Sequence, residues 1–193
     1  FLSPDGKVLT RERADRPHEI KPVEISGAPT YEVSQTFTLA PDESLYGLGQ
    51  YNEPYMDYRG QEVLLVQTNI GTVVPFLVST NRYGILWDIY SKMTFKDDVT
   101  GATLWAESAP GGVDYYFVAG GTMDGVIAGY RALTGASPMF PKQAFGLFMS
   151  KERYQTQDRL VEVVRNFRAA GFPLDYIVQD WQYWGCDSNW NAM

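Results

Sequence analysis

Cysteine and histidine are nearly absent from this sequence, and their scarcity removes several kinds of chemistry. The 193 residues include one Cys and one His. Cys186 has no partner for an internal disulfide, and no Cys/His cluster exists that could hold zinc. A Ser-His-Asp site would need His18, which lies in a polar stretch with loop character, so we disfavour it. We expect neither a metal nor a cofactor.

Positive charge and long apolar runs are also scarce. Lys and Arg number 16 against 23 Asp and Glu, which gives a formal net charge of −7. Nucleic-acid binders need basic side chains to neutralise phosphates, so this balance argues against DNA or RNA as the main partner. No apolar run is long enough for a helix that spans a membrane. The first residues lack the features of a signal peptide, and we leave the compartment open between the cytoplasm and an exported location.

Aromatic side chains, by contrast, are abundant, with 5 Trp, 13 Tyr and 10 Phe. Trp and Tyr combine an apolar face with a polar tip, and this combination suits a sugar ring with its C–H face and hydroxyl edges. An aromatic-rich β core would have the same composition, and composition alone favours that second interpretation.

The chain up to residue 138 has the pattern of a β protein. Residues 31–39 alternate between apolar and polar side chains, as a half-buried strand does. Further strands are predicted at residues 62–67, 73–79, 83–90, 92–96 and 114–119, with turn signals between them. Many short strands at this spacing predict an antiparallel sandwich, followed by a short helix over residues 122–133.

The hydrophobic period changes after a Gly- and Pro-containing joint at residues 134–138. Residues 144–150 are a continuous apolar run, which is typical of a strand buried on both faces. Thr156 is placed to cap a helix, and residues 175–180 predict a second buried strand. Strand, helix and strand together predict a parallel pair with a right-handed crossover.

Asp180 ends the second buried strand, and a segment rich in Trp and amide side chains follows it. Trp181 and Trp184 come first, and Asp187 and Asn189 follow them. In barrels of parallel strands this end of each strand carries the active site. A carboxylate and amides beside indoles are typical of carbohydrate recognition. The alternative is that the Trp side chains pack and Asp180 caps a helix, and the residues alone leave the two interpretations even.

Three motifs, in the same order, resemble glycoside hydrolase family 31. Leu45-Tyr46-Gly47-Leu48-Gly49-Gln50 is similar to the signature of the family's sandwich domain. Residues 138–146 resemble the entry into its barrel, and residues 174–181 resemble the second barrel strand. The resemblance covers essentially the whole chain. It implies a mainly β fold class, with an N-terminal antiparallel β-sandwich (residues 1–138) and the first two strands and first helix of a (β/α)8 TIM barrel (residues 139–193).

The family resemblance also implies an activity, that of a retaining α-glycosidase acting on terminal non-reducing α-linked sugars of an oligosaccharide. It gives Asp180 the role of holding sugar hydroxyls, and it places the nucleophile and the acid/base, both Asp, on later barrel strands. We therefore expect no catalytic residue in this chain. A parallel sheet is not completed by two strands, so we expect a missing C-terminal segment or another chain to supply the remainder of the catalytic barrel. Homo-oligomerisation is left open.

Trp181 points to one sugar within this family. Family members that act on glucose tend to have a moderate aliphatic residue after the Asp, whereas an indole would clash with the C6 hydroxymethyl group that xylose lacks. We therefore predict an α-xylosidase acting on α-xylosyl residues of xyloglucan-type oligosaccharides. The alternatives are an α-glucosidase or other family 31 activity, a non-catalytic carbohydrate-binding relative, and a free-standing scaffold sandwich.

Asn69 and Glu152 complete the predicted substrate-binding set. In the family, a loop from the sandwich reaches over the barrel mouth and often contributes an acidic residue; here Asn69 is the nearest polar candidate, and a plain hairpin loop is the alternative. Glu152 follows the first barrel strand and is placed to face the site, with a surface salt bridge as the alternative.

Overall fold

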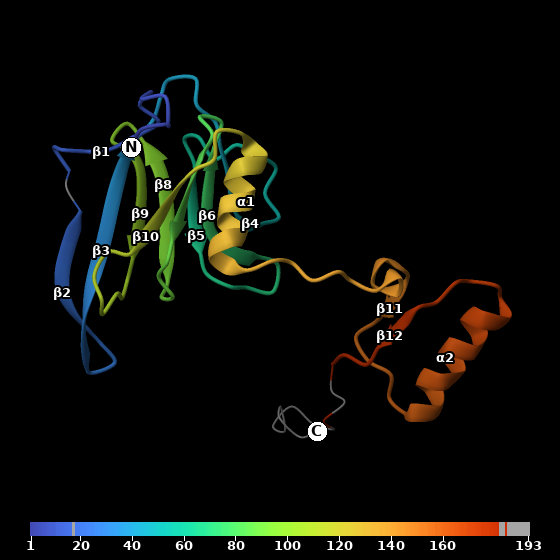
Figure 1. Ribbon diagram of the computed structural model, residues 1–193. Helices are drawn as coiled ribbons and strands as arrows, with labels where there is room; N and C mark the ends of the chain where they lie inside the picture. The colour runs from blue at the N-terminus through green and yellow to red at the C-terminus, as the bar shows by residue number, and fades with distance from the viewer. Residues whose placement is uncertain (17, 182–183, 185–193) are drawn as a thin grey trace. The chain divides into compact units, whose positions relative to one another are not determined.

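The computed structural model describes residues 1–16, 18–181 and 184. The chain divides into two compact units, Phe1–Ala136 and Ser137–Met193, each of which is described by itself (Figure 1). The first unit contains two antiparallel sheets and one helix, and the second contains a short parallel pair, a 3-10 turn and one helix.

Six strands form the first sheet, in the order β1-β3-β9-β8-β5 with β2 also paired to β3. Their bounds are β1 (Arg11–Glu12), β2 (Glu19–Ile25), β3 (Ala28–Thr38), β5 (Glu62–Leu65), β8 (Met93–Asp98) and β9 (Gly101–Ala106). Buried residues alternate with more exposed ones along β5, β8 and β9. This alternation turns one face of the sheet to the core.

The second sheet has four strands in the order β10-β7-β6-β4 and carries a helix on its outer face (Figure 1). The elements are β4 (Leu45–Gln50), β6 (Thr72–Ser79), β7 (Tyr83–Trp87), β10 (Tyr115–Ala119) and α1 (Met123–Thr134). Val126 of α1 packs with Phe76, Val78 and Leu86. Because the helix covers one face and the core the other, β7 is buried at every position.

The core lies between the two sheets. It contains Phe37, Phe95 and Leu104 from the first sheet, and Ile85 and Trp87 from the second. The predicted antiparallel sandwich is therefore confirmed, and so is the helix that follows it. β1, β2, β4 and β9 are strands that the periodicity did not predict.

At Gly47 and Gly49, β4 approaches the backbone of β6 so closely that only glycine fits at these two positions. The backbone has positive φ at Gly47 (99°), Leu48 (63°) and Gly49 (117°), and the pairing with β6 shifts register between the two glycines. A Cβ atom on Gly49 would lie 1.9 Å from the carbonyl oxygen of Thr72, and one on Gly47 would lie 2.2 Å from that of Phe76. This bulge aims the fully buried Leu48 side chain into the core.

A carboxylate is buried at one end of the sandwich and is fully hydrogen-bonded. Glu43 is 3% exposed, and its carboxylate accepts from the hydroxyls of Ser79 and Tyr83, each at 2.5 Å. It also accepts from the side-chain amide of Asn81 at 3.0 Å and the backbone N–H of Ala40 at 2.8 Å. Burial, and then the bond to Glu43, raise the pKa of Tyr83, so this hydroxyl stays a donor. The network joins the loop before β4 to the β6–β7 turn.

The second unit has the predicted order of strand, helix and strand. A 3-10 turn (Lys142–Phe145) leads into β11 (Phe148–Ser150), followed by α2 (Gln157–Ala169) and β12 (Tyr176–Val178). β11 and β12 are parallel. Thr156 caps α2 as predicted, since its hydroxyl accepts from the backbone N–H of Arg159 at 3.1 Å.

One prediction for this unit is wrong. Residues 144–150 are not one strand, because Pro141 precedes a 3-10 turn and β11 begins only at Phe148. Among the described residues β11 and β12 pair only with each other, and Phe148 is 49% exposed. Among residues 1–16, 18–181 and 184, neither α1 nor α2 is long and apolar enough to cross a membrane.

Replacing Glu43 tests the buried network. Glu43→Ala should lower the free energy of unfolding by about 3–5 kcal/mol, because it leaves several buried donors without an acceptor. Tyr83→Phe removes one bond and should lower it by about 1–2 kcal/mol. The measurement is urea denaturation followed by Trp fluorescence. The exposed Glu24 on β2 is the control, and an equal loss in Glu24→Ala would contradict the assignment.

Replacing Gly49 tests the bulge. Gly49→Ala should destabilise the chain by about 3 kcal/mol, because the added methyl group meets a backbone carbonyl oxygen and the positive φ is strained. Gly111→Ala is the matched control, since no atom lies within 4 Å of its added Cβ. The measurement is the thermal unfolding temperature of both variants. A Gly49→Ala protein as stable as the Gly111→Ala control would contradict the steric requirement for glycine in the β4 bulge.

Candidate functional site

The parallel register of β11 and β12 places Glu152 and Asp180 at the same edge of the strand pair. Ser150 pairs with Val178 at the last position of the ladder. Two residues beyond each strand lie Glu152 and Asp180, both exposed. The backbone N–H of Trp181 donates to the carbonyl oxygen of Glu152 at 2.8 Å, so the two connections stay joined past the strands.

Trp181 directly follows Asp180, and its side chain contacts that of Trp184, three residues further along the chain. Their ring centroids are 5.1 Å apart and the rings are nearly perpendicular, at 81°. Both side chains are half-buried. An edge-to-face contact of this kind restricts the orientation of each indole. The arrangement therefore offers a fixed aromatic surface beside an exposed carboxylate.

Tyr154 links the connection after β11 to β12 and was not predicted from the sequence. It is 4% exposed, and its carbonyl oxygen accepts from the side-chain amide of Gln179 at 3.2 Å, which ties the first connection to β12. The Lys151 ammonium lies 5.4 Å from the centre of the Tyr154 ring, within reach of a cation–π interaction. A lone aromatic residue in an otherwise charged loop was the signal that could have identified it.

The connection from β11 to α2 forms a hollow of about 540 Å³ that contains Glu152. Lys151, Arg153 and Arg159 also line it, so the hollow is mainly basic with Glu152 as its acidic member. The Thr156 cap and the buried Tyr154 hold this connection in shape. The geometry suits hydrogen bonding to a polar ligand, with donors from the basic side chains and an acceptor from Glu152.

Asn69 lies in the first compact unit, whereas the other four predicted residues lie in the second. It belongs to the β5–β6 connection and lines a hollow of about 430 Å³ together with residues 50–52. The neighbouring Ile70 is 76% exposed. Tyr51 packs against Gly71 in this loop, since a Cβ there would lie 3.3 Å from the Tyr51 ring. The role of Asn69 stays a prediction.

The remaining predicted polar residues, Asp187 and Asn189, lie outside the described residues. Within residues 1–16, 18–181 and 184, no group of three His, Cys, Asp or Glu side chains could hold a metal ion. The site residues that the structure describes are therefore carboxylates, indoles and amides, which bind ligands by hydrogen bonds and apolar contact.

Comparison with known proteins points to one family. Residues 137–193 match the model of the glycosyl hydrolases family 31 TIM-barrel domain. The alpha-xylosidase of Saccharolobus solfataricus is 44% identical over 172 residues, covering 84% of this chain and 23% of the relative. An uncharacterized family 31 glucosidase of Pseudescherichia vulneris is 30% identical over 162 residues, covering 83% of this chain and 30% of the relative.

A solved structure agrees with these relatives. The GH31 alpha-xylosidase from a soil metagenome, complexed with xylose, superposes with a TM-score of 0.78 at 34% identity, covering 89% of this chain and 25% of that one. The chain thus spans about a quarter of the length of the first of these relatives and of this structure. With its β-sandwich followed by the first two strands and first helix of a TIM barrel, the chain belongs to glycoside hydrolase family 31.

Proposed function

We propose that this chain is part of a retaining α-glycosidase that removes terminal α-xylosyl residues from xyloglucan-type oligosaccharides. The observation that carries the proposal is Trp181, held edge-to-face against Trp184 directly after Asp180 at the carboxyl end of β12. The names of two relatives, both alpha-xylosidases, support the same sugar. The proposed domains are the sandwich at residues 1–138 and the barrel portion from residue 139.

Asp180 is proposed to hold the hydroxyls of the sugar whose bond is cleaved. An exposed carboxylate can accept hydrogen bonds from two adjacent hydroxyls, and such charge-assisted bonds are stronger than neutral ones. The hydrogen bond between Trp181 and Glu152 keeps the backbone next to Asp180 in place. Bonds of this kind accelerate the reaction to the extent that they strengthen as positive charge develops on the ring.

Trp181 is proposed to set the choice of sugar by steric exclusion. Its indole would occupy the volume that the C6 hydroxymethyl group of a glucosyl residue needs, whereas a xylosyl residue has a hydrogen atom at that position. Trp184 restricts the movement of the indole, because the two rings pack at 81°. An indole that cannot rotate away excludes the larger sugar more strongly than a mobile side chain does.

The carboxylates that break the bond are proposed to lie on barrel strands other than β11 and β12. Retaining chemistry needs a nucleophile and an acid/base about 5 Å apart, so that a glycosyl-enzyme forms and is then hydrolysed. The remaining barrel strands would supply both groups and pair with β11 and β12, whose faces are partly exposed among the described residues. Glu152 and Asn69 are proposed as further contacts to the substrate.

An α-glucosidase is the second candidate, because the Pseudescherichia relative is named a glucosidase. The two candidates differ in one measurable quantity, the ratio of kcat/KM for a xyloside and the matching glucoside. A non-catalytic carbohydrate-binding protein would bind either sugar and turn over neither.

The sugar preference tests the proposal directly. The protein with its complete barrel should hydrolyse p-nitrophenyl α-xyloside with a kcat/KM about 100-fold above that for the α-glucoside, because only the glucoside meets the indole. The measurement is initial-rate kinetics on both substrates. A preference for the glucoside would assign the second candidate, and binding of xylose without turnover would make the protein a non-catalytic relative.

Replacing Trp181 tests the steric wall separately. Trp181→Val should raise the ratio of glucoside to xyloside kcat/KM by about tenfold or more, because it opens the volume for a hydroxymethyl group. Trp105→Val is the control, since this half-buried Trp lies on β9 in the other unit and should leave the ratio unchanged. An unchanged ratio in Trp181→Val would remove Trp181 from the specificity argument.

A further inference from the structure

One end of the sandwich gathers several loops that are distant in sequence. Gln50, the last residue of β4, pairs with Thr72 at the start of β6. β7 runs antiparallel to β6, and its last residue, Trp87, pairs with Tyr115 at the start of β10. The connections at residues 66–71, 88–92 and 107–114 therefore all lie at this end. The loop that contains Asn69 is one of them.

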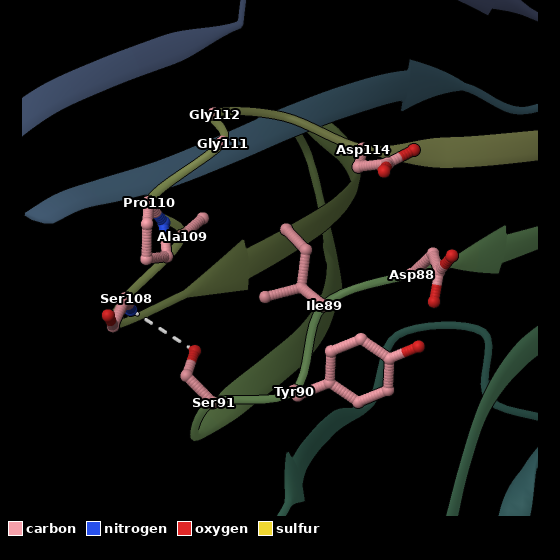
Figure 2. Close-up of a pocket in the computed structure, with 10 residues that line it drawn as sticks. All are labelled: Asp88, Ile89, Tyr90, Ser91, Ser108, Ala109, Pro110, Gly111, Gly112 and Asp114. Atoms are coloured by element: carbon pink, nitrogen blue, oxygen red, sulfur yellow. Dashed lines mark hydrogen bonds between the residues drawn. The ribbon is translucent and has the colours of Figure 1, made fainter.

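A second hollow opens at this end, between residues 88–91 and 108–114. Its volume is about 390 Å³, which lies within the range of about 300–1,000 Å³ typical of small-molecule pockets. Figure 2 shows the two loops facing each other, with the side chain of Ile89 between them. Ile89 is 6% exposed and forms an apolar floor, while Asp88 and Asp114 contribute carboxylates to one side.

The walls of this hollow are held by hydrogen bonds. The backbone N–H of Ser108 donates to the hydroxyl of Ser91 at 3.1 Å, and the backbone N–H of Asp88 donates to the carbonyl oxygen of Asp114 at 3.1 Å (Figure 2 draws the first). Ala109 is buried, and its backbone N–H donates to the backbone carbonyl oxygen of Tyr31 in β3 at 2.8 Å. A ligand would therefore meet a surface that is already formed, which reduces the entropy lost on binding.

Tyr90 is the largest side chain at the rim, and it is 93% exposed. The nearby Asp88 carboxylate, chiefly as a hydrogen-bond acceptor, raises the pKa of Tyr90, so the hydroxyl stays protonated. The ring presents a flat apolar face next to carboxylates and hydroxyls. Flat rings beside acceptors bind the C–H face and the hydroxyl edge of a pyranose at the same time.

We propose that this Tyr90 hollow is a carbohydrate-binding subsite on the sandwich that binds one neutral pyranose of a glycan. Tyr90 stacks on the pyranose, and Asp88 and Asp114 accept hydrogen bonds from its hydroxyls. The choice of a glycan as the ligand rests on the proposed function, because the substrate is then an oligosaccharide with several sugars. The carboxylates of Asp88 and Asp114 at the rim would repel phosphorylated or carboxylated ligands, which favours a neutral glycan.

Binding of a xyloglucan-derived heptasaccharide to the full chain tests this subsite, with isothermal titration calorimetry as the measurement. Tyr90→Ala should raise the Kd about tenfold, equivalent to about 1.4 kcal/mol, while Tyr90→Phe, which keeps the ring, should stay within about threefold of the parent. Asp88→Asn should weaken binding less than Tyr90→Ala. Val99→Ala is the control, since Val99 is fully exposed at the β8–β9 turn, at the opposite end of the sandwich.

A second readout separates this subsite from the proposed function. In the protein with its complete barrel, Tyr90→Ala should weaken binding of the heptasaccharide and leave kcat/KM for p-nitrophenyl α-xyloside unchanged. Binding that depends on Tyr90 without α-xylosidase turnover would sustain the subsite and refute the activity. Heptasaccharide binding that Tyr90→Ala leaves unchanged would overturn the subsite, and so would a fall in unfolding temperature with no change in Kd, which would assign Tyr90 to packing.

Discussion

The hydrogen bond from the Trp181 N–H to the carbonyl oxygen of Glu152 is the contact on which the proposed sugar site depends. It extends the parallel pairing of β11 and β12 beyond the strands, so that two connections distant in sequence form one edge. Asp180 and Trp181 are adjacent in the chain, but this bond gives them a defined position relative to Glu152. The nearly perpendicular contact between Trp181 and Trp184 then orients the indole.

The first unit contributes rigidity of a different kind. The Gly-Leu-Gly bulge inside β4 directs Leu48 into its core, and the buried Glu43 carboxylate joins the loop before β4 to the β6–β7 turn. A buried charge is tolerated there because each of its oxygens accepts hydrogen bonds. Glu43 holds the end of the sandwich at the β6–β7 turn, whereas the opposite end, which carries Tyr90, is held by the hydrogen bonds between Ser91 and Ser108 and between Asp88 and Asp114.

Much of the fold could be predicted from the sequence, because apolar residues recur with a clear period in several of its strands and helices. Alternation identified β3, turn signals bounded β6 and β10, and the Thr156 cap located the start of α2. The periodicity missed β4 because two glycines interrupt it, and β2 because Pro22 and several charged residues lie in an exposed edge strand. It also lengthened β11, since an apolar run does not distinguish a strand from a 3-10 turn that follows a proline.

The sequence by itself determined the candidate residues for sugar binding, because a carboxylate followed by indoles at a strand end is typical of carbohydrate recognition in folds with parallel strands. It also determined the family, through motifs whose order does not depend on packing. Only the tertiary structure decided which residues support the site and where other loops meet. The support from Tyr154 and the Tyr90 hollow arises from hydrogen bonds between segments far apart in the chain, and no local pattern encodes such pairs.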